Sequence, residues 1–395
     1  MNKKFVLTFF FFIFQLTAYA EESLKTVYDK HFLMGTIWHG TKTPGGRDSK
    51  HYSPEGNQEN IFLPLEKYLT VEQFNSITPE NCMKPAFIQP KENVFTFDET
   101  DRMMDFAEAN KLEVVGHTLV WKNATPSWFF VDAKGNKVSR EVLIGRLKKH
   151  IRTVVGRYKG RVKYWDVVNE AVHVERIKGA NKSVGIYRDS GWLDIIGPEY
   201  IEIAYRTANE VDPDAILLYN DFDLDKPSKL DFIISMIKDL RNKGVPVHGL
   251  GYQGHLFLDE PKLSSIERVI QKAKEAKIPL HITELDVSVL PNAWKHRAAS
   301  VEDDFKLAAK FNPYPNKIPS KVLKAQAQRY KEIFDIFIKY SDVIERVTFW
   351  GVWDGNSWRN YKPMRGRTDY PLLFGRDFDY KPAYHSVIKI AKDNN

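Results

Sequence analysis

The sequence predicts a single-domain (β/α)8 TIM barrel, in which eight parallel strands alternate with helices around a closed sheet. Short apolar segments alternate with amphipathic ones from about residue 32 to the end, without a Pro- or Ser-rich linker. The length of 395 residues suits one large barrel with long loops. Polar side chains also stand at the ends of the apolar segments, where a barrel carries its functional groups.

Eight short apolar segments are predicted to be the strands. They are residues 32–38, 76–78, 113–121, 162–170, 215–221, 249–256, 278–287 and 347–354. The fourth segment, VKYWDVVNE, is mostly apolar or β-branched, which is typical of a strand buried on both faces. It ends in Asn169 and Glu170, and the seventh segment carries Glu284 near its end. These two glutamates are the first candidates for functional carboxylates.

Amphipathic segments between the strands are predicted to be helices. They are residues 98–109, 141–158, 198–211, 230–243, 266–276, 321–340 and 384–390. In the first of them Met103, Phe106 and Ala107 recur on one side, as a helix packed on a sheet requires. Gly244 follows the fourth helix as a C-terminal cap. Long polar or charged loops are expected at 41–60 and 294–309.

Two other organisations fit the same alternation of elements. A doubly wound sheet would need a glycine-rich phosphate-binding loop after its first strand, and Gly45-Gly46 does not form that motif. Two ordinary domains would also fit the length. The sequence shows no internal repeat that would support either alternative.

The composition favours a large globular core and argues against nucleic-acid binding. Hydrophobic residues make up 43% of the chain, and aromatic residues make up 13%, with nine Trp. The net charge of +7 is spread along the chain, whereas a nucleic-acid interface needs a clustered basic face. A single cysteine, Cys82, excludes an intrachain disulfide and is interpreted as a small packing group.

The first 20 residues are predicted to be a signal peptide. Lys3 and Lys4 precede an apolar run at 5–16, and Ala18-Tyr19-Ala20 forms an A-x-A cleavage signal. The run is too short for a membrane span. We therefore expect cleavage near Ala20, a catalytic unit at 21–395, and a periplasmic or extracellular location.

Paired carboxylates among aromatic and amide groups suit glycoside hydrolysis. One carboxylate stabilises the cationic sugar ring of the transition state, while the other gives a proton to the departing oxygen. Amides and imidazoles can bind sugar hydroxyls, and Trp rings can pack on the C–H face of the sugar. Because all strand ends of a barrel share one rim, groups scattered in sequence converge there.

Several strand-end motifs together resemble the family 10 glycoside hydrolases, which are mainly endo-β-1,4-xylanases. The matching segments are TPENCMK at 78–84, GHTLVW at 116–121, WDVVNE at 165–170, YND at 219–221, QGH at 253–255, ITELD at 282–286, FWGVWDGNSW at 349–358, RGRTDYPLLF at 365–374 and KPAY at 381–384. Their order along the chain makes the resemblance specific.

The resemblance implies a retaining endo-β-1,4-xylanase with two catalytic glutamates. Glu284 would be the nucleophile and Glu170 the acid/base. Asn169 would bind the sugar 2-hydroxyl, while Asp286 would hold His255 against Glu284. A nearby negative Glu284 is expected to raise the pKa of Glu170 and keep its proton in place.

The resemblance further implies a substrate-binding set around these groups. The positions on the non-reducing side of the scissile bond are Glu80, Asn81, Lys84, His117, Trp121, Gln253, Trp350 and Trp358, and Tyr219 is the position on the leaving-group side. Trp165 and Trp353 are interpreted as core residues. Lys122-Asn123-Ala124 departs from the His-Ser-Gln common in the family, which leaves substrate length and side-group tolerance open.

Three other functions are weighed against this one. A metal-dependent barrel hydrolase could use His117, His255, His281 and Asp286, but such sites usually have closely paired His near the first strand. A non-catalytic sugar-binding protein would need neither glutamate, and β-1,4-glucan is the alternative substrate. The expected partner is xylan or xylo-oligosaccharide, without cofactor, metal, nucleic acid or membrane insertion; the oligomeric state is open.

Overall fold

The computed structural model describes residues 23–40, 64–177, 182–296, 309–364 and 366–394. The expected signal peptide, the loop at 41–60 and most of the charged loop at 294–309 lie outside these described residues.

Eight parallel strands form a closed barrel. They are β1 (Leu33–Trp38), β2 (Ser76–Pro79), β3 (Glu113–Trp121), β4 (Tyr164–Asn169), β7 (Ile216–Asp221), β8 (Gly249–Tyr252), β10 (Leu280–Ser288) and β11 (Ile344–Phe349). Each strand pairs with the next, and β11 also pairs with β1, with Val347 opposite Met34. This pairing closes the sheet, so the predicted (β/α)8 barrel is confirmed and the open doubly wound sheet is excluded.

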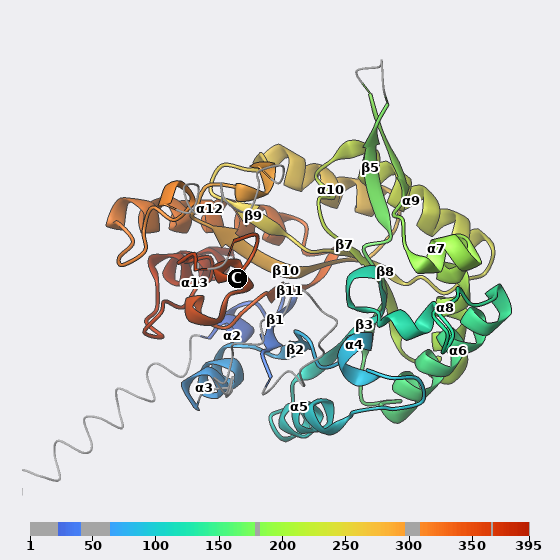
Figure 1. The fold of residues 1–395 in the computed structure, drawn as a ribbon. Coiled ribbons are helices and arrows are strands. Elements are labelled where there is room, and N and C mark those ends of the chain that lie inside the picture. Colours follow the sequence, from blue (N-terminus) through green and yellow to red (C-terminus); the bar gives the residue numbers. More distant parts are fainter. Residues whose placement is uncertain (1–22, 41–63, 178–181, 297–308, 365, 395) are drawn as a thin grey trace, which may run out of the picture.

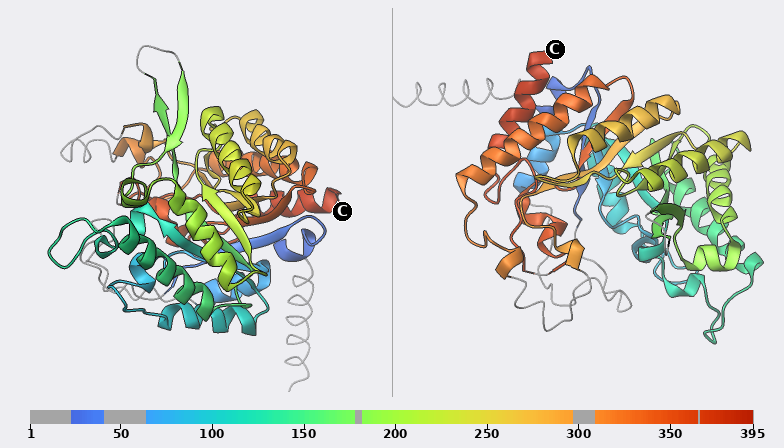
Figure 2. Two further views of the ribbon diagram at one scale, coloured as in Figure 1. Left: turned by 90° about the vertical axis from the view of Figure 1, so that its right-hand side faces the viewer. Right: turned by 90° about the horizontal axis from the view of Figure 1, so that it is seen from above.

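Helices surround the barrel, as Figures 1 and 2 show. The longer ones are α3 (Pro64–Gln73), α5 (Asp98–Ala109), α6 (Arg140–Arg157), α8 (Glu199–Val211), α9 (Pro227–Asn242), α10 (Leu263–Glu275), α12 (Ser320–Lys339) and α13 (Pro382–Asn394); shorter helices are α2 (Leu24–Val27), α4 (Pro85–Ile88) and α7 (Gly191–Ile196). None of the helices in the described ranges combines the length and apolar character that crossing a membrane requires.

The barrel wall is packed so closely that one strand position excludes a side chain. Trp165 on β4 is fully buried, and a Cβ added to Gly116 on β3 would lie 2.1 Å from its ring. The expectation that Trp165 belongs to the core is therefore confirmed. Trp353 lies beyond β11, half-buried, and stacks on Phe378 with ring centroids 4.3 Å apart.

The structure differs from the expected elements in two strands. The expected sixth strand is divided into β8 and β9 (His255–Phe257), which both pair with β10. Gly254 separates them with φ +75°, a backbone conformation that favours glycine. The eighth strand covers Ile344–Phe349 rather than 347–354, so Trp350 is the first residue after the strand.

An antiparallel hairpin that the sequence did not predict follows β4. Its strands are β5 (Val172–Arg176) and β6 (Ser183–Tyr187), and it projects away from the barrel in Figures 1 and 2. Its alternation is weak because both strands are largely exposed or half-buried. The hairpin leads directly to Arg188, which lies at the candidate site.

Candidate active site

The two candidate glutamates lie at the same rim of the barrel, at the carboxyl ends of the strands. Glu170 follows the last residue of β4, while Glu284 lies on β10 two residues before Asp286, which pairs with His255 of β9. Both glutamates are buried, with 8% and 5% of their surfaces exposed. This convergence is expected, because the carboxyl ends of all strands of a parallel barrel lie at one rim.

The Glu284 carboxylate is fixed at both oxygens. Asn220 Nδ2 donates a hydrogen bond to Oε1 at 2.8 Å, and His255 Nε2 lies 3.1 Å from Oε2. Thr283 Oγ1 in turn donates to Asn220 Oδ1 at 2.6 Å, which orients the amide so that its NH2 group faces Glu284. The oxygens of Glu284 are therefore held in one orientation.

His255 is held by Asp286, which is itself completely buried. Asp286 Oδ2 lies 3.1 Å from His255 Nδ1 and accepts from Trp358 Nε1 at 2.8 Å, while Arg359 Nε donates to Oδ1 at 2.8 Å. Burial would lower the pKa of His255, but Asp286 and Glu284 outweigh it and raise this pKa to about 9. Below that pH the imidazolium places a positive charge beside Glu284.

The Glu170 carboxylate receives donors from three different segments. Trp121 Nε1 donates to Oε2 at 2.9 Å, Arg188 Nη1 donates to the same oxygen at 2.8 Å, and Gln253 Nε2 donates to Oε1 at 3.1 Å. Glu170 has φ +57°, which is uncommon for a residue other than glycine. Such backbone conformations concentrate at functional sites.

The ionisation of Glu170 differs from the expectation. The sequence predicted a raised pKa because of a nearby negative Glu284, and burial does act in that direction. Arg188, with Gln253 and Trp121, outweighs burial and lowers the pKa of Glu170 below its usual value. This prediction was wrong because it did not include Arg188, which directly follows a hairpin that the sequence did not predict.

A short network of amides connects the two carboxylates. Asn220 Nδ2 donates to Glu284 and, at 3.0 Å, to Asn169 Oδ1. Gln253 Nε2 donates to Glu170 and lies 3.4 Å from the same Asn169 oxygen. We call the side chains of Asn169, Asn220 and Gln253 the polar floor. Asn169 lies at its centre, Glu284 contacts it through Asn220, and Glu170 contacts it through Gln253.

The remaining groups extend this floor toward β1 and β2. Lys84 Nζ donates to Asn81 Oδ1 at 3.1 Å and lies 4.9 Å from the centre of the Trp121 ring. Glu80 Oε2 forms an ion pair with His39 Nδ1 at 2.8 Å. Burial would lower the pKa of His39, but Glu80 outweighs burial and raises this pKa to about 9. Glu80, Asn81 and Lys84 therefore join the same rim as Glu170.

His117 and Trp350 contact each other near His255. His117 Nδ1 lies 2.8 Å from Asp166 Oδ2, and the His117 ring meets the edge of Trp350 with centroids 5.4 Å apart. Trp350 also faces His255 at 6.5 Å. Trp358, which donates to Asp286, packs against His255 with centroids 4.7 Å apart.

Comparisons with known proteins show the family of the chain. The sequence pattern of "Glycosyl hydrolase family 10" matches residues 47–390. The chain belongs to this family.

Two relatives and one solved structure illustrate the family similarity. Endo-1,4-beta-xylanase A of Xylanibacter ruminicola is 37% identical over 94% of this chain and 94% of that protein. Endo-1,4-beta-xylanase of Geobacillus stearothermophilus is 41% identical over 84% of this chain and 93% of its own length. The structure of a GH10 endoxylanase retrieved from a sugarcane soil metagenome has a TM-score of 0.80 at 36% identity and covers 94% of this chain and 99% of that one.

Tyr219, which was expected on the leaving-group side, is instead buried against Asp221 and the Ala171 backbone. Its side chain is fully buried, donates to Asp221 Oδ2 at 2.6 Å and accepts from the Ala171 amide at 3.0 Å. Successive side chains of a strand point to opposite faces, so Tyr219 points away from the face that Asn220 presents to Glu284. It supports the backbone after Glu170 instead of facing the leaving group.

Lys229 is the counterion of this buried group. Its Nζ lies 2.6 Å from Asp221 Oδ1, and both side chains are at most 2% exposed. Replacing Lys229 by methionine would leave the Asp221 carboxylate buried without its cation, and we expect a loss of about 3–5 kcal/mol of folding free energy. Thermal unfolding of the variant should show a much lower melting temperature than that of Lys226→Met.

Lys226 is a suitable control because it lies next to α9 and also pairs with an aspartate. Its partner Asp223 and Lys226 itself are 42% and 52% exposed, so this pair contributes little to stability. Equal melting temperatures for the two variants would contradict the structural role of Lys229.

The four residues considered as metal ligands do not form one cluster. His281 lies at the second position of β10, and its ring meets Tyr164 with centroids 5.5 Å apart. His255 and Asp286 lie together at the other end of that strand. Among the described residues no group of three His, Cys, Asp or Glu is placed to hold a metal ion.

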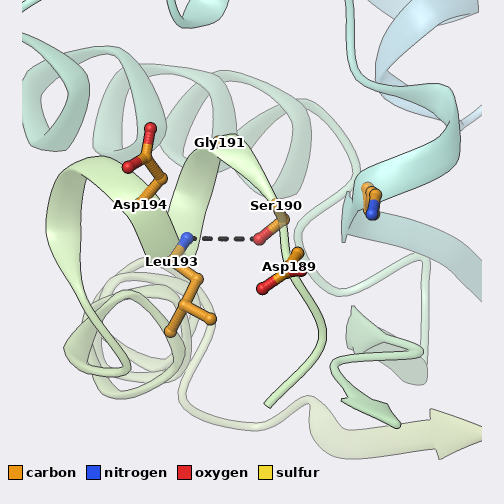
Figure 3. Close-up of a pocket in the computed structure, with 6 residues that line it drawn as sticks. Asp189, Ser190, Gly191, Leu193 and Asp194 are labelled. Atoms are coloured by element: carbon orange, nitrogen blue, oxygen red, sulfur yellow. Dashed lines mark hydrogen bonds between the residues drawn. The ribbon is translucent and has the colours of Figure 1, made fainter.

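A cavity of about 440 Å³ lies next to the segments that contact Glu170 (Figure 3). It is lined by Lys122, Asp189, Ser190, Gly191, Leu193 and Asp194. Trp121 and Arg188 both donate to Glu170, and the residues that follow them in the sequence, Lys122 and Asp189, line the cavity. Lys122, the first residue of the segment where the sequence departs from the family pattern, therefore lines this cavity.

Three functional neighbours were missed from the sequence. Arg188 contacts Glu170, His39 contacts Glu80, and the half-buried Phe222 lies with its ring centre 5.2 Å from the guanidinium of Arg188. His39 directly follows β1, which pairs with β2, and so lies beside Glu80. No periodic pattern in the sequence marks Arg188.

Proposed function

We propose that this chain is a retaining endo-β-1,4-xylanase, with Glu284 as the nucleophile and Glu170 as the acid/base. The observation that carries the proposal is the pair of buried carboxylates at one rim, each with a different set of partners. Glu284 is held beside the cationic His255, and Glu170 is held by donors from three segments. The names of the family relatives support xylan as the substrate.

In the first step Glu284 attacks the anomeric carbon of the xylose that precedes the scissile bond. A bond forms between a carboxylate oxygen and C1, while the bond from C1 to the leaving oxygen breaks. Glu170 gives its proton to that oxygen, which departs as a sugar hydroxyl. The contacts from Asn220 and His255 keep Glu284 oriented toward the same point of the cleft.

In the second step a water molecule replaces the departed sugar. Glu170, now ionised, takes a proton from the water as its oxygen attacks C1, and the ester bond to Glu284 breaks. Because the charge of Glu284 is absent in the covalent intermediate, Glu170 is more easily ionised at this stage. The product leaves with the configuration it had in the polymer.

The polar floor and the aromatic groups are proposed to hold the sugar units. Asn169 and Gln253 lie between the carboxylates, where amides can bind the hydroxyls of the reacting xylose. Glu80, Asn81 and Lys84 are proposed to bind the next unit on the non-reducing side. Trp350 and Trp358 supply apolar ring faces beside His255.

The stereochemistry of the first product tests this mechanism. Two displacements at C1 restore the original configuration, so the newly formed reducing end should be the β anomer. Proton NMR of a xylo-oligosaccharide digest, recorded before mutarotation, should show the β signal first. An initial α signal would exclude the covalent intermediate while leaving the substrate assignment intact.

Xylan is the proposed substrate, and the proposed location is outside the cytoplasm. A product profile on xylan, xylo-oligosaccharides and cellulose should show internal cleavage of xylan, and comparable cleavage of cellulose would favour β-1,4-glucan as the substrate.

The proposal of export rests on the basic and apolar segments of the first 20 residues. N-terminal sequencing of the secreted protein should begin near Glu21.

A further inference from the structure

Arg188 approaches Glu170 from outside the barrel strands. It directly follows β6, and its backbone N–H donates to Ala171 O at 2.7 Å, so the base of the hairpin closes beside Glu170. The side chain is 21% exposed and the Glu170 side chain 11% exposed. This ion pair is therefore largely shielded from water, unlike the surface pairs elsewhere on the chain.

The hairpin is docked so that Arg188 has little freedom. Gly185 on β6 lies so close to α9 that an added Cβ would lie 2.5 Å from Phe232 Cβ and 2.7 Å from the Ser228 carbonyl oxygen. Tyr187 meets the Phe232 ring edge to face, with centroids 5.1 Å apart. The guanidinium of Arg188 in turn lies 5.2 Å from the Phe222 ring centre. The position of the positive charge is thus built into the fold.

Few other charges in the described part of the chain face Glu170. From β3 and the turn after β8 come the neutral donors of Trp121 and Gln253. Asp221 on β7 interacts electrostatically with Glu170, but its own charge is paired with Lys229 of α9. Glu284 on β10 is separated from Glu170 by the amide network. Arg188 is the cation that contacts the Glu170 carboxylate directly.

We propose that Arg188 is a positioning residue that sets the ionisation of the acid/base and thereby the pH range of both chemical steps. This inference rests on the proposed role of Glu170. A guanidinium 2.8 Å from Oε2 stabilises the carboxylate over the carboxylic acid. The contact therefore favours the second step, which needs the ionised base, and it opposes protonation for the first step.

The sign of the pH effect follows directly. The first step needs protonated Glu170, so kcat/KM on an unactivated xylo-oligosaccharide falls as pH rises through the pKa of Glu170. The second step needs the carboxylate, so its rate falls as pH drops through the pKa of Glu170 in the intermediate. Removing Arg188 raises both pKa values. The alkaline limb of the kcat/KM profile and the acidic limb of the second-step profile should therefore both move to higher pH.

The experiment is a pH profile of Arg188→Met beside the unmodified enzyme. On xylo-oligosaccharides the alkaline limb of kcat/KM should move up by about 1–3 pH units, the range for loss of an adjacent charge. On an aryl xylobioside with a dinitrophenol leaving group, kcat is expected to report the second step, and its acidic limb should move up as well. Arg188→Lys keeps a cation and should leave both limbs near their original positions.

Two controls separate this effect from damage to the fold. Arg176→Met removes the same charge from an exposed position of the same hairpin and should leave the profile unchanged. Arg188→Gln provides a second neutral variant if Arg188→Met is poorly folded, and its limbs should move in the same way. A structural role alone would lower activity at every pH without moving either limb.

The outcome also distinguishes this inference from the proposed function. Unmoved limbs in both neutral variants would overturn the role of Arg188, while the anomer test and Glu170→Ala could still support the mechanism. If Glu170→Ala loses activity equally on activated and unactivated substrates, Glu170 is not the acid/base, and the inference about Arg188 fails with it.

Discussion

Glu284→Ala is expected to abolish turnover of xylan and of activated aryl xylosides alike. Without the carboxylate no covalent bond to C1 can form, and a better leaving group does not replace the nucleophile. Loss of a nucleophile typically lowers kcat by about 10⁴-fold or more. Initial rates on xylan and on a dinitrophenyl xylobioside measure this loss directly.

An external nucleophile makes the prediction specific. The alanine leaves space on the face of the sugar that Glu284 occupied, where azide can enter and form a bond to C1 as dinitrophenolate leaves. Because this is a single displacement, the product should be the α-xylobiosyl azide. Glu275→Ala, an exposed position on α10, is the matched control and should keep normal turnover. Appreciable hydrolysis by the Glu284 variant without azide would argue for a different nucleophile.

The sequence was sufficient to predict the barrel and most of the groups at its rim. A closed parallel sheet brings the carboxyl ends of all its strands to one rim, so Glu170 and Glu284 lie at the same rim although 113 residues separate them along the chain. The contact of His255 with Glu284, and its support by Asp286, were expected from the family resemblance, and the pairing of β9 with β10 explains them.

The errors arose where side chains depend on neighbours that no strand pattern specifies. Tyr219 was interpreted as a leaving-group contact, but alternation along β7 turns it toward Asp221 and the Ala171 amide. The pKa of Glu170 was predicted from Glu284 alone. Arg188, which lowers this pKa, follows a hairpin whose strands show little alternation of buried and exposed residues and were therefore not predicted. His39 was not connected with Glu80 because that contact needs the pairing of β1 with β2.

Glu170→Ala should affect unactivated and activated substrates very differently. Xylan needs a proton on the departing sugar oxygen, and loss of a general acid typically costs about 10²–10⁴-fold. A dinitrophenyl xylobioside needs no such proton, so its kcat/KM should remain close to that of the unmodified enzyme. Its kcat should nevertheless fall, because the second step loses its base and the covalent intermediate accumulates.

This accumulation provides the decisive measurement. Rapid mixing with the dinitrophenyl substrate should show a burst of one dinitrophenolate per enzyme, followed by slow turnover that azide accelerates. The trapped product should be the β-xylobiosyl azide, opposite to the product of the Glu284 variant, because azide here attacks the covalent intermediate from the Glu170 side. Glu175→Ala, exposed on the neighbouring hairpin, should keep the steady-state turnover of the unmodified enzyme and should show no acceleration by azide. Equal losses of kcat/KM on xylan and on the activated substrate would contradict the assignment of Glu170, since only a proton donor distinguishes leaving groups by their acidity.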